Sequence, residues 1–278
     1  MIYQDQSLET SEYAIVRWFG FDAFVPEHSV TSHWVSSKTF FIIRSVLTLY
    51  STIVLWTDIG INRSGTFFHY FTSMTFIGLH AYQVTSLIHH FRYLYTKKVS
   101  FFLEQYAFLN YLYVYLYSTV ITFNIVTPVV YWAILAKGMA ATNTVGTWLN
   151  VSVHGVSFFL MIIDVLLNRM RISVRMVIFP LVTMICYMLF AFIVYAVQGI
   201  WIYPFLNWQQ GSSAAIWYFA VAIICVVIFF IQVLIHWGRD YVARKAGKAD
   251  SPEINEKVND QYENSPAKLE AGDSPNVA

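Results

Sequence analysis

Between Thr39 and Trp237 the chain carries only twelve charged side chains in 199 residues. Over all 278 residues, 57% are hydrophobic and 12% are charged, whereas a typical soluble domain has about 25% charged residues. Because so few charges cannot cover a water-exposed surface of this size, the sequence excludes an ordinary soluble enzyme. The net charge of +1 also gives no strong field that would attract nucleic acid.

Six apolar stretches dominate this region. A helix needs about 20 apolar residues to cross the hydrocarbon core of a bilayer, and the stretches lack the alternation of membrane β-barrel strands. The sequence therefore predicts an all-α fold, a polytopic membrane bundle of six transmembrane helices. The predicted spans are residues 39–57, 67–91, 106–135, 144–167, 174–197 and 214–237.

The basic residues predict the orientation of the spans. Loops rich in Lys and Arg stay on the cytosolic side of a membrane. With six spans both termini share one side, and twelve basic residues fall on that side against two, Arg63 and Lys137, on the other. Both termini are therefore predicted to be cytosolic. The twelve are Arg17, Lys38, Arg92, Lys97, Lys98, Arg169, Arg171, Arg175, Arg239, Arg244, Lys245 and Lys248.

Three regions follow from this pattern. Residues 1–38 form a cytosolic N-terminal arm, whose aromatic segment 13–25 either lies on the lipid surface or is solvated. Residues 39–237 form the six-helix transmembrane domain. Residues 238–278 form a cytosolic tail, which becomes polar and acidic beyond Gly247, a composition typical of disorder.

Polar side chains inside the spans are informative, because each one must face protein or water rather than lipid. At 100° per residue they fall on one face of each of three predicted spans, which suggests a shared polar cavity. Asp164 lies at the edge of the third face and is expected to pair with Arg169 or Arg171. The faces comprise His69, Thr72, Ser73, His80, Gln83 and His90; Tyr106, Asn110, Tyr113, Tyr117 and Asn124; and Thr147, Asn150, His154, Ser157 and Asn168.

The histidines also raise the alternative of a metal-dependent enzyme. Metal sites of that type need clustered ligands, and only His89 and His90 are closely spaced. Adjacent helical residues point about 100° apart, so this pair does not form a site. We therefore predict no metal and no cofactor.

Several of these segments together resemble the androgen-induced protein family and the neighbouring rolling stone family of polytopic membrane proteins. The similarity covers about residues 40 to 235. It rests on Tyr70-Phe71-Thr72, on Leu149-Asn150 followed by His154, on Phe179-Pro180-Leu181, and on Trp201-Ile202-Tyr203-Pro204-Phe205-Leu206.

Characterised androgen-induced proteins are threonine hydrolases that cleave fatty acid esters of hydroxy fatty acids. The resemblance therefore implies Thr72 as nucleophile and His154 as base. By sequence alone, Thr75 is a competing candidate. An oxyanion would need hydrogen-bond donors. The remaining candidates for substrate binding or oxyanion stabilisation are Asn150, Tyr113, Tyr117, His69 and His80.

A second function class stays open at this point. In a non-catalytic membrane scaffold of the rolling stone type, the polar faces would only hold the helices together by hydrogen bonds. Membrane lipids are the expected surroundings in either case, and a lipid ester is the substrate in the first. The endoplasmic reticulum is the default location, with the plasma membrane or another endomembrane as alternatives. Cytosolic partners of the tail are unknown.

Overall fold

The computed structural model describes residues 6–62, 65–136 and 144–249. The chain divides into two compact units, Met1–Trp237 and Gly238–Ala278. Arg63, Lys137 and the tail beyond residue 249, which entered the sequence-based predictions, lie outside the described residues. In the second unit, the described residues include the last turns of a helix and an ion pair between Arg239 and Asp240, 2.8 Å long.

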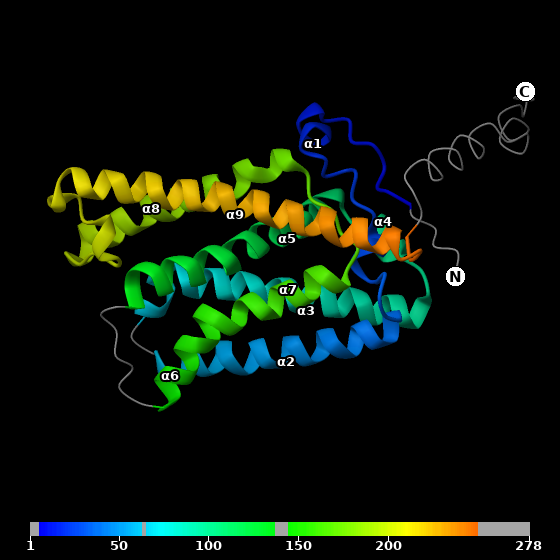
Figure 1. The fold of residues 1–278 in the computed structure, drawn as a ribbon, viewed down its shortest axis with the longest axis horizontal. Coiled ribbons are helices and arrows are strands. Elements are labelled where there is room, and N and C mark those ends of the chain that lie inside the picture. Colours follow the sequence, from blue (N-terminus) through cyan, green and yellow to red (C-terminus); the bar gives the residue numbers. More distant parts are fainter. Residues whose placement is uncertain (1–5, 63–64, 137–143, 250–278) are drawn as a thin grey trace, which may run out of the picture. The chain divides into compact units, whose positions relative to one another are not determined.

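Every regular element in the described part of the chain is helical. Within the first unit the long helices run side by side along roughly one direction (Figure 1). The α-helices are α1 (Ala14–Phe19), α2 (Ser37–Ile61), α3 (Phe71–Thr96), α4 (Ser100–Leu103), α5 (Ala107–Val130), α6 (Thr144–Val151), α7 (Ser157–Leu167), α8 (Ile178–Gln198) and α9 (Ser212–Lys245).

Shorter helical turns connect or interrupt these helices. The 3₁₀ turns are η1 (Pro26–Ser29), η2 (Thr66–His69), η6 (Val174–Val177), η7 (Pro204–Leu206) and η8 (Trp208–Gln210). Two segments are π-helical: η3 (Tyr131–Leu135), which continues α5, and η5 (Ser152–Val156), which joins α6 to α7.

Among the described residues, five helical stretches are long and apolar enough to cross a membrane. This all-helical arrangement is that of a candidate multi-pass membrane protein, and the five stretches agree with five of the six spans predicted from the sequence. They are Ser37–Ile61, Ala107–Leu135, Thr144–Leu167, Val174–Gln198 and Ser212–Lys245.

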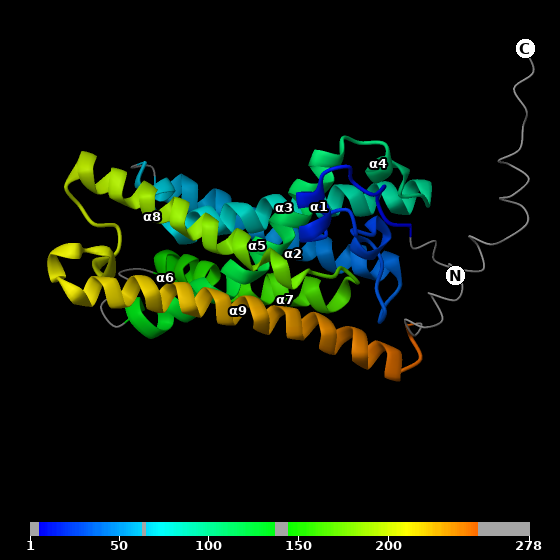
Figure 2. The ribbon, with the colours of Figure 1, turned by 90° about the horizontal axis from the view of Figure 1, so that it is seen from above.

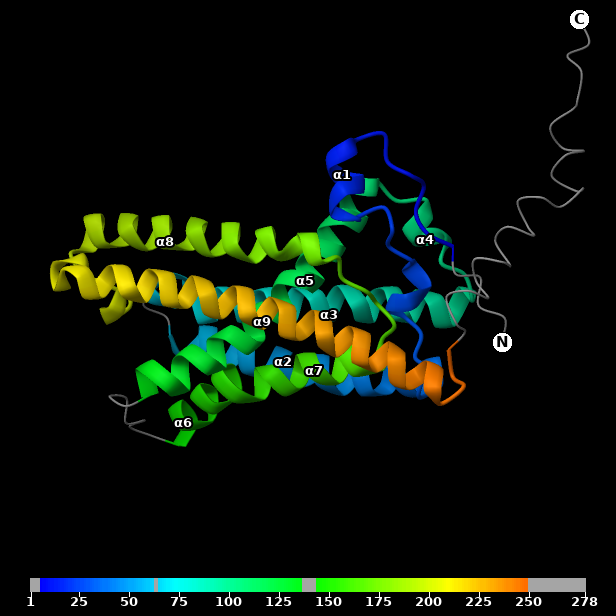
Figure 3. The same cartoon turned by 45° about the horizontal axis from the view of Figure 1, so that its top comes forward.

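The remaining predicted span corresponds to α3, which has 26 residues but many polar ones. It packs most extensively against α2 and α5, and Figures 2 and 3 show it running beside both. Its buried side includes Phe76, Leu79 and Tyr82 together with Gln83 and His90. The polar content of α3 thus reflects its position between other helices.

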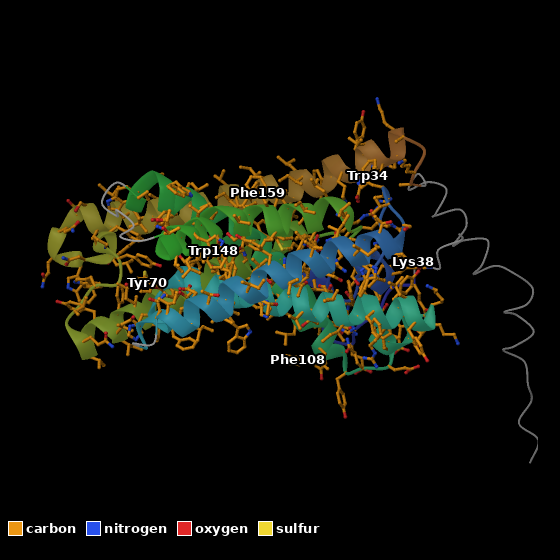
Figure 4. All side chains as sticks on the ribbon, turned by 90° about the horizontal axis from the view of Figure 1, so that it is seen from below. Trp34, Lys38, Tyr70, Phe108, Trp148 and Phe159 are labelled. Carbon is orange, nitrogen blue, oxygen red and sulfur yellow. The ribbon has the colours of Figure 1, made fainter. Side chains whose placement is uncertain are left out.

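Two ends of the first unit can be distinguished. The start of α2 lies at one end, and the start of α3 lies at the other, as the labelled Lys38 and Tyr70 show (Figure 4). The segment 199–211, which joins α8 to α9, lies at the same end as Tyr70 (Figures 1 and 2). Gly199 terminates α8 with a φ of 71°, a left-handed conformation that glycine adopts readily.

The N-terminal segment packs against the bundle over part of its length. Helix α1 buries none of its residues, but Phe21 and Phe24 belong to the main hydrophobic core and Val30 is fully buried. The carbonyl of His28 accepts a hydrogen bond of 2.9 Å from the Arg169 backbone N–H. Several residues between 21 and 32 are therefore buried against the bundle, a packing that the sequence did not indicate.

We expect Phe24→Ala to destabilise the protein by about 3 to 5 kcal/mol, because it leaves a cavity in a packed core. The Phe24 ring lies 5.7 Å from that of Phe102 and 5.8 Å from that of Tyr113. Thermal unfolding in detergent would measure the change. Tyr13→Ala serves as control, since Tyr13 is 70% exposed. Equal unfolding temperatures for the two variants would contradict the packing described here.

Candidate functional site

Thr72 is the second residue of α3, and Tyr70 is the residue that precedes the helix. The first backbone N–H groups of an α-helix have no partner within the helix. Here the N–H of Phe71 donates to the Tyr203 hydroxyl, 3.1 Å away. Tyr203 and Thr72 also line the same cavity. Thr72 is thus placed at a helix start that a tyrosine from another segment covers.

Tyr203 belongs to the Trp-Ile-Tyr-Pro-Phe-Leu segment between α8 and α9. Its ring stacks on Phe205, with centroids 5.2 Å apart, and only 9% of the residue is exposed. Burial raises the pKa of the Tyr203 phenol above its ordinary value, while its contact with Thr72 opposes that shift. The ordinary value is about 10, so the phenol is protonated at physiological pH.

A cavity of about 160 Å³ lies beside Thr72, between α3, α5, α8, α9 and the segment containing Tyr203. Its wall is mostly aliphatic and aromatic. The residues with polar side-chain atoms in the wall are Thr72, Thr127, Tyr131, Tyr187, Tyr203, Trp217 and Tyr218. The Thr127 hydroxyl donates a hydrogen bond to the carbonyl of Phe123, and the Tyr218 hydroxyl donates one to the carbonyl of Leu206. Such a wall suits a hydrocarbon chain with one polar group near Thr72.

His154 lies in the middle of the π-helical segment η5. Its imidazole stacks on the Tyr131 ring, with centroids 3.7 Å apart and planes 7° apart. Tyr131 is itself the first residue of the π-helical segment η3, and its hydroxyl accepts a hydrogen bond from the amide of Asn150. Short π-helical segments are rare and occur frequently at functional sites; here two of them meet.

Tyr131 connects the two predicted catalytic residues. It lines the cavity together with Thr72 and stacks on His154. In the described part of the chain, Nδ1 of His154 is buried without a hydrogen-bond partner. The structure contains no hydrogen bond between described atoms of Thr72 and His154; the imidazole lies behind Tyr131, and no residue of α7 or η5 lines the cavity.

The competing hydroxyl, Thr75, belongs to a different environment. It is 7% exposed and donates to the carbonyl of Thr72, 2.9 Å away. It lines a second cavity of about 370 Å³ between α3, α5 and α8. Phe71 and Tyr187 line both cavities. Thr72 therefore lines one of two neighbouring cavities and Thr75 lines the other.

The other predicted site residues lie away from the Thr72 cavity. The hydroxyl of Tyr113 forms a hydrogen bond of 2.8 Å with the hydroxyl of Ser86. The hydroxyl of Tyr117 forms one of the same length with Nε2 of His236. His80 uses Nδ1 to bond the hydroxyl of Ser51, 3.0 Å away. None of these three residues lines the cavity.

Two further residues of the predicted faces have unexpected positions. His69 contributes its backbone carbonyl, which accepts a hydrogen bond of 2.8 Å from the Tyr187 hydroxyl. Tyr106 precedes α5 and is 86% exposed, so it does not belong to an interior face. The predicted single polar cavity between three spans is therefore replaced by an apolar cavity and a separate polar interior.

That polar interior is organised around a buried ion pair. Arg44 of α2 binds Asp164 of α7 through two nitrogens, each 2.8 Å from the same carboxylate oxygen, and their side chains are 1% and 2% exposed. The structure thus pairs Asp164 with Arg44, whereas the sequence suggested Arg169 or Arg171. The hydroxyl of Tyr82 donates to the other carboxylate oxygen, 2.7 Å away.

Tyr131, Tyr203 and the Arg44–Asp164 pair have no role predicted from the sequence. Tyr131 could have been found, because it lies seven residues after Asn124 and thus on the same helical face. Tyr203 lies in the most distinctive of the family-like segments, but in a loop, where periodicity predicts no direction. Nothing in the spacing of Arg44 identifies its partner 120 residues away.

A cluster of metal ligands is not present in the described ranges, where no three His, Cys, Asp or Glu residues could hold an ion. Comparisons with protein families, curated proteins and solved structures found no match to this chain. The chemistry of the site is therefore the basis for assigning a function.

Proposed function

We propose that this chain is an integral membrane hydrolase that cleaves fatty acid esters of hydroxy fatty acids or similar lipid esters. Thr72 is the nucleophile and His154 the base, as the resemblance to the androgen-induced family implies. The observation that carries the proposal is the position of Thr72: it lines an apolar cavity whose wall also includes Tyr131, the residue that stacks on His154.

The proposed membrane topology has six spans, α3 included, with both termini in the cytosol. The five apolar helices support five of these spans. Helix α3 is long enough for the sixth, since 26 residues at about 1.5 Å each extend about 39 Å. Its polar residues largely face α2 and α5, which lowers the cost of placing them at membrane depth. We propose the endoplasmic reticulum as its location, with the plasma membrane or another endomembrane as alternatives.

Glycosylation mapping tests this topology. A glycosylation acceptor inserted between α2 and α3 is expected to be modified, because six spans place that loop on the lumenal side. Acceptors fused at either terminus are expected to remain unmodified. Modification of an acceptor at either terminus would contradict the six-span arrangement, whether or not the acceptor in this loop is also modified.

The proposed reaction is acyl transfer. A threonine hydroxyl attacks an ester efficiently only when a base removes its proton during attack. The Thr72 proton passes to His154, the Thr72 oxygen bonds the ester carbon, and the ester C–O bond breaks. His154 then returns the proton to the departing alkoxide. Water, deprotonated by the same imidazole, releases the acid from the acyl-threonine and restores both residues.

The environment of His154 supports its role as base. Stacking on Tyr131 orients the imidazole plane, and the bond from Asn150 holds Tyr131 in turn. Nδ1 has no hydrogen-bond partner in the described part of the chain, so it is available to accept a proton directly or through water. The catalytic step requires the imidazole to reach past the edge of Tyr131 toward Thr72.

The shape and polarity of the cavity support a lipid ester as substrate. Aliphatic and aromatic side chains from α5, α8 and α9 form most of the wall, which favours an acyl chain. The ester carbonyl would lie next to Thr72, close to the hydrogen bond between the Phe71 N–H and the Tyr203 hydroxyl.

One observation favours the non-catalytic scaffold as a second candidate. Many hydroxyl groups in the bundle bond carbonyls of their own helix, as do those of Thr119, Thr122 and Thr183. Such bonds satisfy polar groups without forming a site. A scaffold predicts that Thr72→Ala folds and retains the cellular role of the protein.

Labelling with an activated fluorophosphonate probe in membranes separates the two candidates. We expect the wild-type protein to be labelled, and the Thr72→Ala and His154→Ala variants to lose labelling. Unfolding temperatures measured in parallel would show that each variant is folded. Equal labelling of all three folded proteins would remove the nucleophile assignment.

A further inference from the structure

Helix α1 is attached to the start of the apolar stretch that contains α8 (Figure 3). The Arg175 guanidinium donates a hydrogen bond of 2.8 Å to the carbonyl of Trp18 and lies over the Trp18 ring. The rings of Phe19 and Phe21 pack against Phe179, at centroid distances of 4.6 and 5.3 Å. These contacts fix α1 beside the first turns of Val174–Gln198, a stretch apolar enough to cross a membrane.

The attachment point sets the depth of α1. Three arginines, at positions 169, 171 and 175, come just before the apolar part of this stretch, and a change from basic to apolar residues marks the boundary between lipid headgroups and hydrocarbon. With this stretch crossing the bilayer, as the proposed six-span topology has it, α1 lies at that boundary. Beyond it, exposed apolar residues recur every three or four positions of α8: Ile178, Val182, Ile185, Leu189 and Ile193.

The outward face of α1 is apolar. Ile15 and Trp18, three residues apart and so on one face of the helix, are 62% and 45% exposed. Tyr13, which precedes the helix, is also exposed, and no residue of α1 is buried. Tryptophan and tyrosine gather at membrane interfaces because each ring combines an apolar body with one polar group. This face is therefore suited to the same lipid that surrounds α8.

The charges around this face complement lipid phosphate. Arg17 and Arg175 are both exposed, and in the described ranges neither forms an ion pair with a carboxylate. Each uses Nη1 for backbone carbonyls, those of Ser11 and Glu12 for Arg17 and that of Trp18 for Arg175. The other N–H groups of each guanidinium can bind a phosphate, whose oxygens match the planar donor geometry of arginine.

We propose that α1 is an interfacial anchor that binds the phospholipids of the leaflet at which α8 begins. Ile15 and Trp18 lie among the upper parts of the acyl chains, while Arg17 and Arg175 contact headgroup phosphates. Interfacial helices bury their apolar face about 5 to 10 Å into this boundary. Of the two placements that the sequence leaves open for this segment, the anchor is the one on the lipid surface.

Spin labels on the full-length protein test the depth of α1. Cysteine replaces Ile15, Lys98 or Ile193 in a Cys186→Ser background, in phosphatidylcholine nanodiscs that hold one protein copy each. The parent without an added cysteine reports any labelling of Cys225, which is buried. Collision rates are measured with oxygen, which concentrates in hydrocarbon, and with a nickel chelate, which stays in water. The exposed turn residue Lys98 is the water reference and Ile193 the lipid reference.

We expect the ratio of oxygen to nickel collisions at Ile15 to be several times that at Lys98 and to approach that at Ile193. A ratio equal to that at Lys98 would show a solvated helix and overturn the anchor. A label at Ile15 that is shielded from both reagents would show that protein covers this face, which also overturns it. If the label at Ile193 is itself open to nickel, the proposed span of α8 fails and the anchor fails with it.

Two variants of Arg17 test the phosphate contact, each combined with the label at Ile15. Arg17→Glu is expected to lower the ratio of oxygen to nickel collisions, because a carboxylate repels the phosphates. Arg17→Lys keeps the positive charge and is expected to preserve the ratio. An unchanged ratio in Arg17→Glu, or an equal loss in both variants, would overturn the contact between Arg17 and phosphate.

Discussion

Replacing Arg44 with methionine while Asp164 is retained is expected to destabilise the protein by about 3 to 5 kcal/mol. The carboxylate of Asp164 is 2% exposed and takes its charge partner from Arg44. Without the guanidinium, a buried negative charge would keep only neutral donors, the hydroxyl of Tyr82 and the amide of Asn168. Unfolding in detergent, followed by fluorescence, would measure the loss.

The double variant Arg44→Met/Asp164→Leu provides the decisive comparison. Removing both charges also removes the desolvation cost that each one carries, so the double variant is expected to regain most of the lost stability. Arg92→Met, at an exposed position of α3, is expected to change the free energy of unfolding by no more than about 0.5 kcal/mol. A single variant as stable as wild type would contradict the buried pair.

The second large effect is expected on catalysis. Thr72→Ala should lower kcat/KM for a lipid ester at least about 1,000-fold, because removing a nucleophile eliminates the covalent pathway. Thr72→Ser keeps the hydroxyl at the start of α3 and should retain activity within roughly tenfold of wild type. Hydrolysis of a fatty acid ester of a hydroxy fatty acid by the purified protein in mixed micelles would measure both.

Thr75→Ala is the matched control for this prediction. It removes a hydroxyl one turn further along α3, on the wall of the other cavity, and is expected to leave kcat/KM within a fewfold. Activity that depends on Thr75 but not on Thr72 would move the nucleophile to the second cavity. Activity that is lost equally in both variants, with lowered unfolding temperatures, would indicate damage to α3 instead.

Different parts of this molecule could be predicted from sequence to different degrees. Apolar runs such as residues 174–197 predict helices closely, and the structure has an apolar helical stretch from Val174 to Gln198. For α3, periodicity correctly predicted that Gln83 and His90 face the interior. The N-terminal segment was predicted less well, because Phe21 and Phe24 are buried by contacts with distant residues and not by a local pattern.

The candidate site was predicted as a set of residues but not as an arrangement. Thr72 and His154 were identified through a family resemblance, and their faces through helical spacing. The stacking partner of Tyr131 is His154, which lies inside the π-helical segment η5; a π-helical turn shifts the angular position of the residues within and after it. A constant angle of 100° per residue cannot reproduce this shift.

The sequence alone determined that the chain forms long apolar helices with polar residues turned inward, because neither exposed backbone nor exposed charge is tolerated in a hydrocarbon environment. Only the tertiary structure decided which inward-facing groups meet: Arg44 with Asp164, and Tyr131 with His154. The physical reason is that periodicity sets the direction of a side chain around its own helix axis. The rotation and order of neighbouring helices, which determine its partner, depend on the packing of the whole bundle.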